Sequence, residues 1–159
     1  METDAVIAGN YRYKLTRTWE EGPRVAFVML NPSTADETED DPTIRRCVGF
    51  ARDWGYTGLV VVNLFAFRTK DPPVLLTVPQ PVGALNPFFW REVRDDPTVN
   101  QIIAAWGAAP LAQRVVPLFQ AVMQETGRMV QCLGETEHGH PKHPLYLAKT
   151  TKRREYALC

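Results

Sequence analysis

The sequence carries no net charge: 18 Lys and Arg residues balance 18 Asp and Glu residues in a chain of 159. This balance excludes a histone-like polycation that binds nucleic acid through charge alone. No segment reaches the roughly 18 uncharged apolar residues that a membrane span needs. The acidic start, Met1-Glu2-Thr3-Asp4, also lacks the basic residues of a secretory signal. We therefore expect a cytoplasmic protein with no membrane partner.

Cysteine is scarce too. Cys47, Cys132 and Cys159 are far apart in the sequence and form no Cys-x-x-Cys pair for zinc or redox chemistry. We expect reduced thiols that are buried or incidental, and no cofactor.

What the sequence does contain is four short apolar runs, mostly continuous rather than alternating, at residues 25–30, 59–62, 102–106 and 129–133. Strands buried on both faces of a parallel sheet have this pattern. With the segments between them, the runs predict one α/β domain over residues 1–159. Its architecture is expected to be a three-layer sandwich with a central, mainly parallel four-stranded sheet. Residues 1–20 should form an N-terminal extension or an edge strand, and residues 149–159 a basic tail.

Two further segments are typical of helices. Between the first two runs, Asp41 suits an N-cap, Pro42 the first helical position, and Gly55 the end. Residues 111–124 also have helical character, but Pro117 should kink or split that helix. The long connection at residues 65–100 contains six prolines and should cross the surface, with a helical piece around residues 88–94.

Polar or aromatic residues follow each predicted strand. Asn31 and Asn63 come directly after the first two runs, and the three histidines, His138, His140 and His143, follow the fourth. Ligands of an open α/β sheet bind beyond the carboxyl ends of its strands, so we expect these segments to converge on one crevice. The residues expected to contact substrate there are Pro32, Ser33, Thr34, Asn63, Phe65, Trp106 and Gly107.

Several longer motifs occur in a fixed order: Met29-Leu30-Asn31-Pro32-Ser33-Thr34-Ala35-Asp36, Asp41-Pro42-Thr43-Ile44-Arg45-Arg46-Cys47, Trp54-Gly55-Tyr56, Val62-Asn63-Leu64-Phe65-Ala66, Ala105-Trp106-Gly107 and Gly139-His140-Pro141-Lys142-His143-Pro144-Leu145-Tyr146-Leu147. Through them, residues 25–147 resemble a bacterial and phage family catalogued as domain of unknown function 1643. One departure is Pro87, which stands where an acidic residue usually follows the asparagine matching Asn86. The family resemblance implies no activity.

The order Asn-Pro, Asn, Trp-Gly and His-Pro after successive strands is also similar to the uracil-DNA glycosylase superfamily. This resemblance implies that superfamily's fold and a catalytic arrangement. Asn31 would hold the hydrolytic water, and His140 or His143 would stabilise the departing base. Asn63 would correspond to a position that reads the base or lines the pocket. Leu145 and Tyr146 would contact the substrate from the position of the loop that wedges into a duplex.

The chemistry can be argued from the residues as well. Hydrolysis of an N-glycosidic bond needs one group that orients water and one donor that stabilises the leaving base. The sequence therefore predicts a nucleobase-recognising, DNA glycosylase-like hydrolase that acts on a damaged or modified base. Two alternatives stay open. One is a non-catalytic module that binds a nucleotide or modified base. The other is a metal-dependent hydrolase that uses the acidic loop at residues 36–41 and the histidines, whose spacing also suggests a metal site with Glu135 or Glu137.

Charge is distributed unevenly along the chain. Residues 1–41 contain nine acids and four bases, and the remainder contains nine acids and fourteen bases. Five of the acids fall within residues 36–41, where we expect a solvated loop that ends in a helix cap, with Mg²⁺ binding as the alternative. Carboxylates beside a crevice repel phosphate, so a duplex would be held weakly. If a nucleotide or nucleic acid is the partner, the phosphate contacts should be Arg45, Arg46, Arg68 and Lys142, together with the basic tail.

Overall fold

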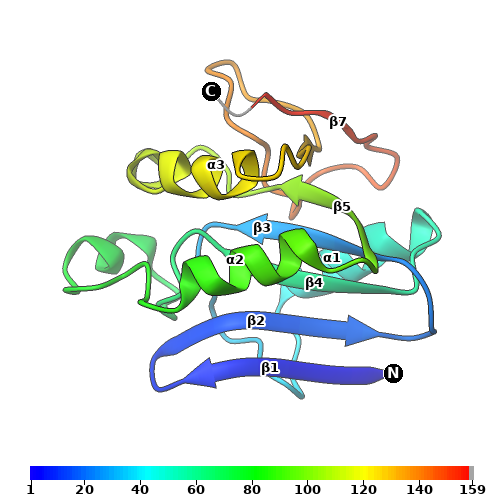
Figure 1. Ribbon diagram of the computed structural model, residues 1–159, viewed down its shortest axis with the longest axis horizontal. Coiled ribbons are helices and arrows are strands. Elements are labelled where there is room, and N and C mark those ends of the chain that lie inside the picture. The colour runs from blue at the N-terminus through cyan, green and yellow to red at the C-terminus, as the bar shows by residue number, and fades with distance from the viewer. Residues whose placement is uncertain (158–159) are drawn as a thin grey trace.

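A computed structural model describes residues 1–157 as one seven-stranded mixed sheet with three α-helices (Figure 1). The strand order is β1-β2-β4-β3-β5-β6-β7. The strands are β1 Glu2–Ala8, β2 Tyr11–Thr18, β3 Arg24–Met29, β4 Gly58–Asn63, β5 Val99–Ala104, β6 Gln131–Cys132 and β7 Arg154–Glu155. The helices are α1 Pro42–Asp53, α2 Asn86–Asp95 and α3 Val116–Gln124, with short 3-10 turns η1 Pro72–Leu76 and η2 Pro110–Arg114.

The sheet is larger and less parallel than the sequence predicted. The four predicted strands are β3, β4, β5 and β6, and they do pair in parallel, in the order β4-β3-β5-β6. Antiparallel strands extend this group on both sides: β2 and β1 beyond β4, and β7 beyond β6. The prediction of a four-stranded, mainly parallel sheet was therefore right for the central strands and wrong in the number of strands and in the antiparallel pairing at both edges. Strand β1 starts with three exposed polar residues and has no fully buried residue, and β7 consists of two exposed charged residues, so neither resembles the buried apolar runs that identified the others.

The helices cover both faces of the sheet. In Figure 1, α2 and α3 lie in front of the sheet and α1 lies behind it. Alternate side chains of β3 divide between the two layers. Ala26 and Val28 pack in the core that contains α2 and α3, and Val25 and Phe27 in the core that contains α1. The carboxyl ends of the central strands are thus held between helices on both sides.

The helix boundaries follow the local signals in the sequence. The Asp41 side chain accepts a hydrogen bond from the Ile44 N–H at 2.9 Å, which confirms it as the N-cap of α1. Gly55 follows this helix with φ of 83°, a conformation that favours glycine. Pro117 lies in the first turn of α3, so the predicted helix over residues 111–124 is split into η2 and α3. No described helix is long and apolar enough to cross a membrane.

Strand β2 contains one extra residue opposite β1. Val6 pairs with Lys14 and Ile7 with Arg12, so the register skips Tyr13. Tyr13 then stacks on Phe89 of α2 at a ring separation of 5.3 Å. Arg12 instead reaches the opposite side of the sheet, where it donates to the Ala35 main-chain oxygen at 2.9 Å. The bulge therefore directs Arg12 toward the loop that follows β3.

The expected basic tail is attached to the body of the protein as far as it is described. The Arg153 guanidinium lies 4.5 Å from the Trp54 ring centroid and donates to Tyr56 Oη at 3.1 Å and to Gln101 Oε1 at 2.5 Å. Strand β7 pairs with β6 beside these contacts. Arg153 is thus occupied by protein groups rather than offered to phosphate.

Two of the three cysteines, Cys47 and Cys132, are buried free thiols. Burial raises the pKa of Cys47, which keeps that thiol protonated and unreactive. Cys159, for which we also expected a reduced thiol, lies outside the described residues.

Substitution Arg153→Ala should release the C-terminal segment while leaving the rest of the sheet folded. A hydrogen bond to a charged group contributes about 1.5–3 kcal/mol, and a cation–π contact about 0.5–1 kcal/mol at a partly exposed site. We expect faster amide hydrogen exchange at residues 152–157, and a free energy of unfolding lowered by about 1–3 kcal/mol. Arg153→Lys is the control, because it keeps the charge and loses the planar stacking and paired donors. Unchanged exchange in Arg153→Ala would show that β7 is held by other contacts.

Candidate functional site

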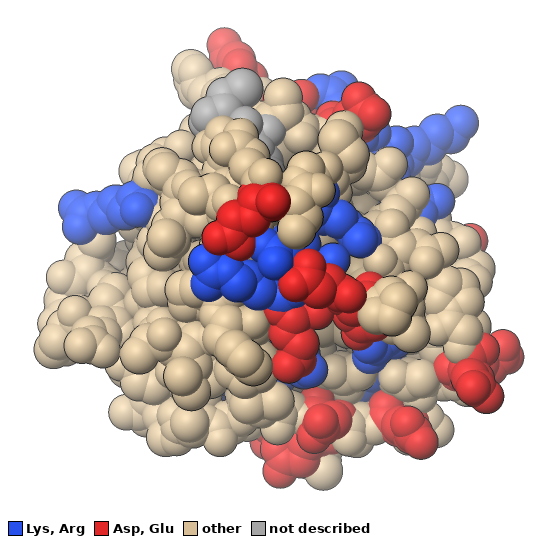
Figure 2. Space-filling view, viewed as in Figure 1, with Lys and Arg blue, Asp and Glu red and all other residues tan. Residues whose placement is uncertain are grey.

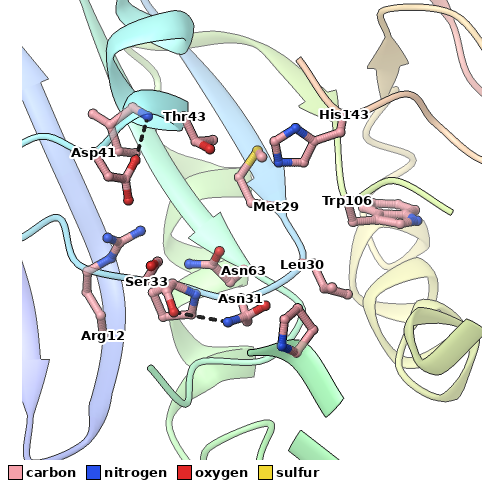
Figure 3. A pocket seen from close by; sticks show the side chains of 13 residues that line it. Arg12, Met29, Leu30, Asn31, Ser33, Asp41, Thr43, Asn63, Trp106 and His143 are labelled. Atoms are coloured by element: carbon pink, nitrogen blue, oxygen red, sulfur yellow. Dashed lines mark hydrogen bonds between the residues drawn. The ribbon is translucent and has the colours of Figure 1, made fainter. Parts of the chain in front are cut away.

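A pocket of about 190 Å³ opens at the carboxyl ends of β3, β4 and β5 (Figure 3). Its floor and walls come from the loop after β3, the last residue of β4, the residues after β5, the start of α1, strand β2 and a C-terminal loop. The pocket is smaller than those that hold drug-sized ligands, so it suits a small ligand of one or two rings. It is lined by Arg12, Met29, Leu30, Asn31, Pro32, Ser33, Asp41, Thr43, Ile44, Asn63, Pro72, Trp106 and His143.

Asn63 is the most unusual residue in the pocket. Its side chain is 1% exposed, and neither Nδ2 nor Oδ1 has a hydrogen-bond partner among residues 1–157. Its main-chain oxygen, by contrast, accepts from Trp90 Nε1 at 2.9 Å and from Asn86 Nδ2 at 2.8 Å. The backbone is therefore fixed from behind while the amide is free to bind. A buried amide without partners is costly, so such a group suggests a role in ligand binding.

Asn31 is held by its nitrogen. Nδ2 donates to the main-chain oxygens of Pro32 at 3.0 Å and of Thr69 at 2.8 Å. These two bonds set the orientation of the amide and leave Oδ1 as an acceptor. A fixed acceptor of this kind can orient a water molecule, but an amide cannot act as a strong base.

His143 lies across the pocket from Arg12 and Asp41 (Figure 3). The Leu145 N–H donates to its Nδ1 at 3.2 Å, so a neutral ring carries its proton on Nε2. Loss of solvation lowers the pKa of His143 below its usual value, and the negative charge of Asp41 opposes that shift in part. At neutral pH the ring is therefore uncharged and can donate one hydrogen bond from Nε2.

Arg12 and Asp41 supply the charges of the pocket. Arg12 is 2% exposed, and this desolvation lowers its pKa to about 10, although it remains protonated at neutral pH. Its Nε is buried and has no acceptor among the described residues. Asp41 caps α1 through one carboxylate oxygen. Sequence reasoning missed Arg12 as a pocket residue and assigned Asp41 only its capping role. Two features of the sequence could have indicated these residues. Arg12 lies between Tyr11 and Tyr13 in a predicted edge strand, and Asp41 caps a helix that begins close to the predicted crevice.

Six of the predicted catalytic and substrate-binding residues line this pocket, namely Asn31, Pro32, Ser33, Asn63, Trp106 and His143. The others, which do not line it, are Thr34, Phe65, Gly107, His140, Leu145 and Tyr146. His140 Nδ1 lies 3.3 Å from Gln113 Nε2, outside the pocket. Tyr146 is 94% exposed. Of the two histidines considered for one role, only His143 lines the pocket that contains Asn31.

None of the four predicted phosphate contacts lines the pocket. Arg45 donates to the Asp40 main-chain oxygen, and the Arg46 guanidinium lies over the Phe50 ring. Arg68 donates to the main-chain oxygens of Ser33 and Thr34 at 3.3 and 3.4 Å and so supports the loop after β3. Lys142 is exposed, and its side chain passes close to Gly134.

The face that bears α2 and α3 is no basic surface either. Figure 2 shows acidic and basic side chains gathered together near its centre. Arg91 and Arg94 of α2 pair with Glu125 at 3.0 and 2.5 Å, and Arg94 also pairs with Asp95 at 2.8 Å. These charges are neutralised within the protein. They offer little attraction for a phosphate backbone.

The acidic loop at residues 36–41 is held by the side chain of Arg17. Arg17, which is 1% exposed, donates from Nε to Asp40 Oδ1 at 2.9 Å and from Nη2 to the Asp36 main-chain oxygen at 2.5 Å. The Asp36 carboxylate accepts from the N–H groups of Thr38 and Glu39, which lowers its pKa. Within residues 1–157, no three His, Cys, Asp or Glu side chains are placed to hold a metal ion. The metal-dependent alternative therefore gains no support from the site.

Substitution Asp41→Asn should lower the pKa of His143 further, because it removes the negative charge that favours the protonated ring. Asparagine keeps an oxygen that can cap α1, so the fold should persist. NMR titration of the ring measures the effect. The native pKa lies below that of the unfolded chain, so His143 should lower stability as the pH falls from about 6.5 through the native pKa, and contribute nothing above that range. A His143 pKa that rises in Asp41→Asn would contradict this placement of the carboxylate.

Together, the fold and the pocket define an α/β protein with a mixed sheet and a small polar site at the ends of its parallel strands. The chain belongs to the family described as Protein of unknown function (DUF1643), whose model matches residues 12–145. No curated protein and no solved structure matches the chain. A relationship to the uracil-DNA glycosylase superfamily is therefore not supported by any comparison, and it stays a hypothesis about chemistry.

Proposed function

We propose that this protein binds a nucleobase in the pocket and hydrolyses the N-glycosidic bond of that base. The observation that supports this most is the buried Asn63 amide, whose donor and acceptor both lack partners among the described residues. The edge of a nucleobase presents adjacent donor and acceptor groups, and an asparagine side chain can pair with both at once. A single base also agrees with the volume of about 190 Å³.

The remaining pocket residues suit the steps of hydrolysis. Asn31 Oδ1 accepts a hydrogen bond from water and orients the oxygen that attacks the anomeric carbon. As the C–N bond breaks, its electron pair stays on the base, and His143 Nε2–H donates to a base oxygen that gains negative charge. The attacking water gives up a proton to solvent as it bonds to the anomeric carbon, and the base anion takes up a proton from solvent as it leaves. Asn31 and His143 correspond to the roles that the resemblance to the uracil-DNA glycosylase superfamily implies.

A flexible or free substrate fits this site better than a stacked duplex. The predicted phosphate contacts lie away from the pocket, and the acidic loop adjoins it. A base within a duplex must leave the stack, which costs a few kcal/mol and is offset by protein contacts to the backbone. Nucleosides, nucleotides and single strands avoid most of this cost.

The test is release of free base. The protein is incubated with nucleosides and with single- and double-stranded oligonucleotides that carry uracil, other deaminated bases or modified pyrimidines. Chromatography detects the base, and alkali treatment detects abasic sites. We expect release by the native protein, at least 100-fold less by Asn31→Ala and His143→Ala, and native release by His140→Ala, the matched control outside the pocket.

Two results would contradict the proposal. Base-dependent binding without release would instead support a non-catalytic module that recognises a nucleotide or modified base. Neither binding nor release with any substrate would exclude nucleobase recognition altogether. Thermal unfolding of Asn31→Ala is measured in parallel, because this substitution also removes the bonds to the Pro32 and Thr69 carbonyls.

A further inference from the structure

One wall of the pocket carries two opposite charges that do not pair. Figure 3 shows Arg12 and Asp41 projecting from β2 and from the start of α1 toward the same part of the pocket. Arg12 donates from Nη1 to the Ala35 main-chain oxygen, and its Nε has no acceptor in residues 1–157. Asp41 uses Oδ1 to cap α1. No ion pair joins Arg12 to Asp41 or to any other carboxylate in the described part of the chain.

Asp41 is nevertheless close enough to Arg12 to affect its pKa. The negative charge of Asp41 stabilises the protonated form of Arg12 and also that of His143 on the opposite wall. Asp41 therefore acts on basic groups on both walls of the pocket. A cation and a carboxylate that face one pocket without touching leave room for a ligand group that bonds to both.

The chemistry of that group follows from the two charges. A phosphate or carboxylate drawn to Arg12 would be repelled by Asp41, and an ammonium drawn to Asp41 would be repelled by Arg12. A neutral hydroxyl satisfies both, because its oxygen accepts from the guanidinium while its proton is donated to the carboxylate. The Ser33 and Thr43 hydroxyls, which also line the pocket, add further partners of the same kind.

We propose that Arg12 and Asp41 form a sugar subsite that binds the 2′ and 3′ hydroxyls of a ribose, so that the ligand is a ribonucleoside or ribonucleotide rather than a deoxynucleotide in DNA. This inference rests on the proposed function, which places the base on Asn63. A vicinal diol is the part of a nucleoside that offers donors and acceptors in pairs. Removal of the 2′ hydroxyl leaves the buried arginine or the carboxylate with one partner fewer.

The test is the affinity of the full-length protein for matched ribose and deoxyribose probes, measured by calorimetry. Pseudouridine and formycin B are suitable, each beside its 2′-deoxy form, because their carbon–carbon glycosidic bonds resist hydrolysis. We expect at least one ribose form to bind about tenfold more tightly than its deoxy form, as the loss of one hydrogen bond to a charged group predicts. In Asp41→Asn this ratio should fall to about one.

The matched control is Glu39→Gln, which removes one carboxylate from the same loop at an exposed position outside the pocket. It should retain the tenfold ratio. Equal affinity of the native protein for both sugar forms, with binding still lost in Asn63→Leu, would overturn the sugar subsite and leave base recognition intact. An unchanged ratio in Asp41→Asn would likewise overturn it. Failure of the native protein to bind any of the four probes would contradict both proposals.

Discussion

Replacement of Asn63 with leucine should make the protein more stable and remove its ability to bind a nucleobase. Leucine has nearly the shape of asparagine but no polar atoms, so it eliminates two buried groups that lack partners among the described residues. An unsatisfied buried group costs about 1–3 kcal/mol, and we expect the free energy of unfolding to rise by an amount in that range. Base binding should weaken about 10- to 100-fold, because a bidentate pair contributes about 1–3 kcal/mol.

The opposite directions of these two effects make the prediction specific. The bonds from Trp90 and Asn86 reach the main-chain oxygen of residue 63, so Asn63→Leu preserves them. Asn63→Asp is the control: it buries a carboxylate without a partner and should lower both stability and binding. Denaturant unfolding and calorimetric titration measure the two quantities on the same samples. A clear loss of stability in Asn63→Leu would mean that the amide supports the fold rather than a ligand.

Trp90→Ala should cause the largest loss of stability of any substitution considered. Trp90 is fully buried on the face of α2 that meets the sheet, and its ring contacts Phe119 of α3 edge-on at 5.5 Å. Truncation of a buried tryptophan to alanine typically costs about 3–5 kcal/mol, because the surrounding structure closes only part of the cavity. For a chain of this length, that loss corresponds to a fall in melting temperature of roughly 6–20 °C.

Trp90→Phe separates packing from hydrogen bonding. Phenylalanine retains most of the ring but not the indole N–H that donates to the Asn63 main-chain oxygen. We expect a smaller loss, about 1–2 kcal/mol, together with weaker ligand binding, because residue 63 is then held by Asn86 alone. Equal destabilisation in both variants would show that the hydrogen bond, rather than the ring, supplies the stability.

The central part of the fold could be predicted because its signals are local. Continuous apolar runs identified β3, β4, β5 and β6, and a capping aspartate followed by proline identified α1. Strand β1 begins with Glu2, Thr3 and Asp4, and its apolar part is only the four residues 5–8, none of them fully buried. Strand β7 has two exposed residues and is anchored by the distant contacts of Arg153. Neither could be found from periodicity.

The candidate site was predictable to the same degree. The rule that ligands bind at strand ends predicted one crevice lined by Asn31, Asn63, Trp106 and His143, and these four residues do line one pocket. The rule could not choose between His140 and His143, because that depends on how one proline-containing loop folds. It also could not place Arg12, which comes from an antiparallel strand outside the parallel core. A charged residue that reaches the pocket from within a neighbouring antiparallel strand cannot be found by inspecting the residues that follow parallel strands.

The extra residue in β2 decides on which face of the sheet Arg12 lies, and therefore whether the pocket contains a positive charge. Loss of one residue between Ala8 and Tyr13 would restore regular alternation, and the side chain of Arg12 would then lie on the same face as Phe89. The pocket would lose its cation although no lining residue had been replaced. Within this family, the number of residues between Ala8 and Arg12 is therefore as informative as the identity of the arginine. Insertions and deletions in the first hairpin should separate members with a charged pocket from members without one.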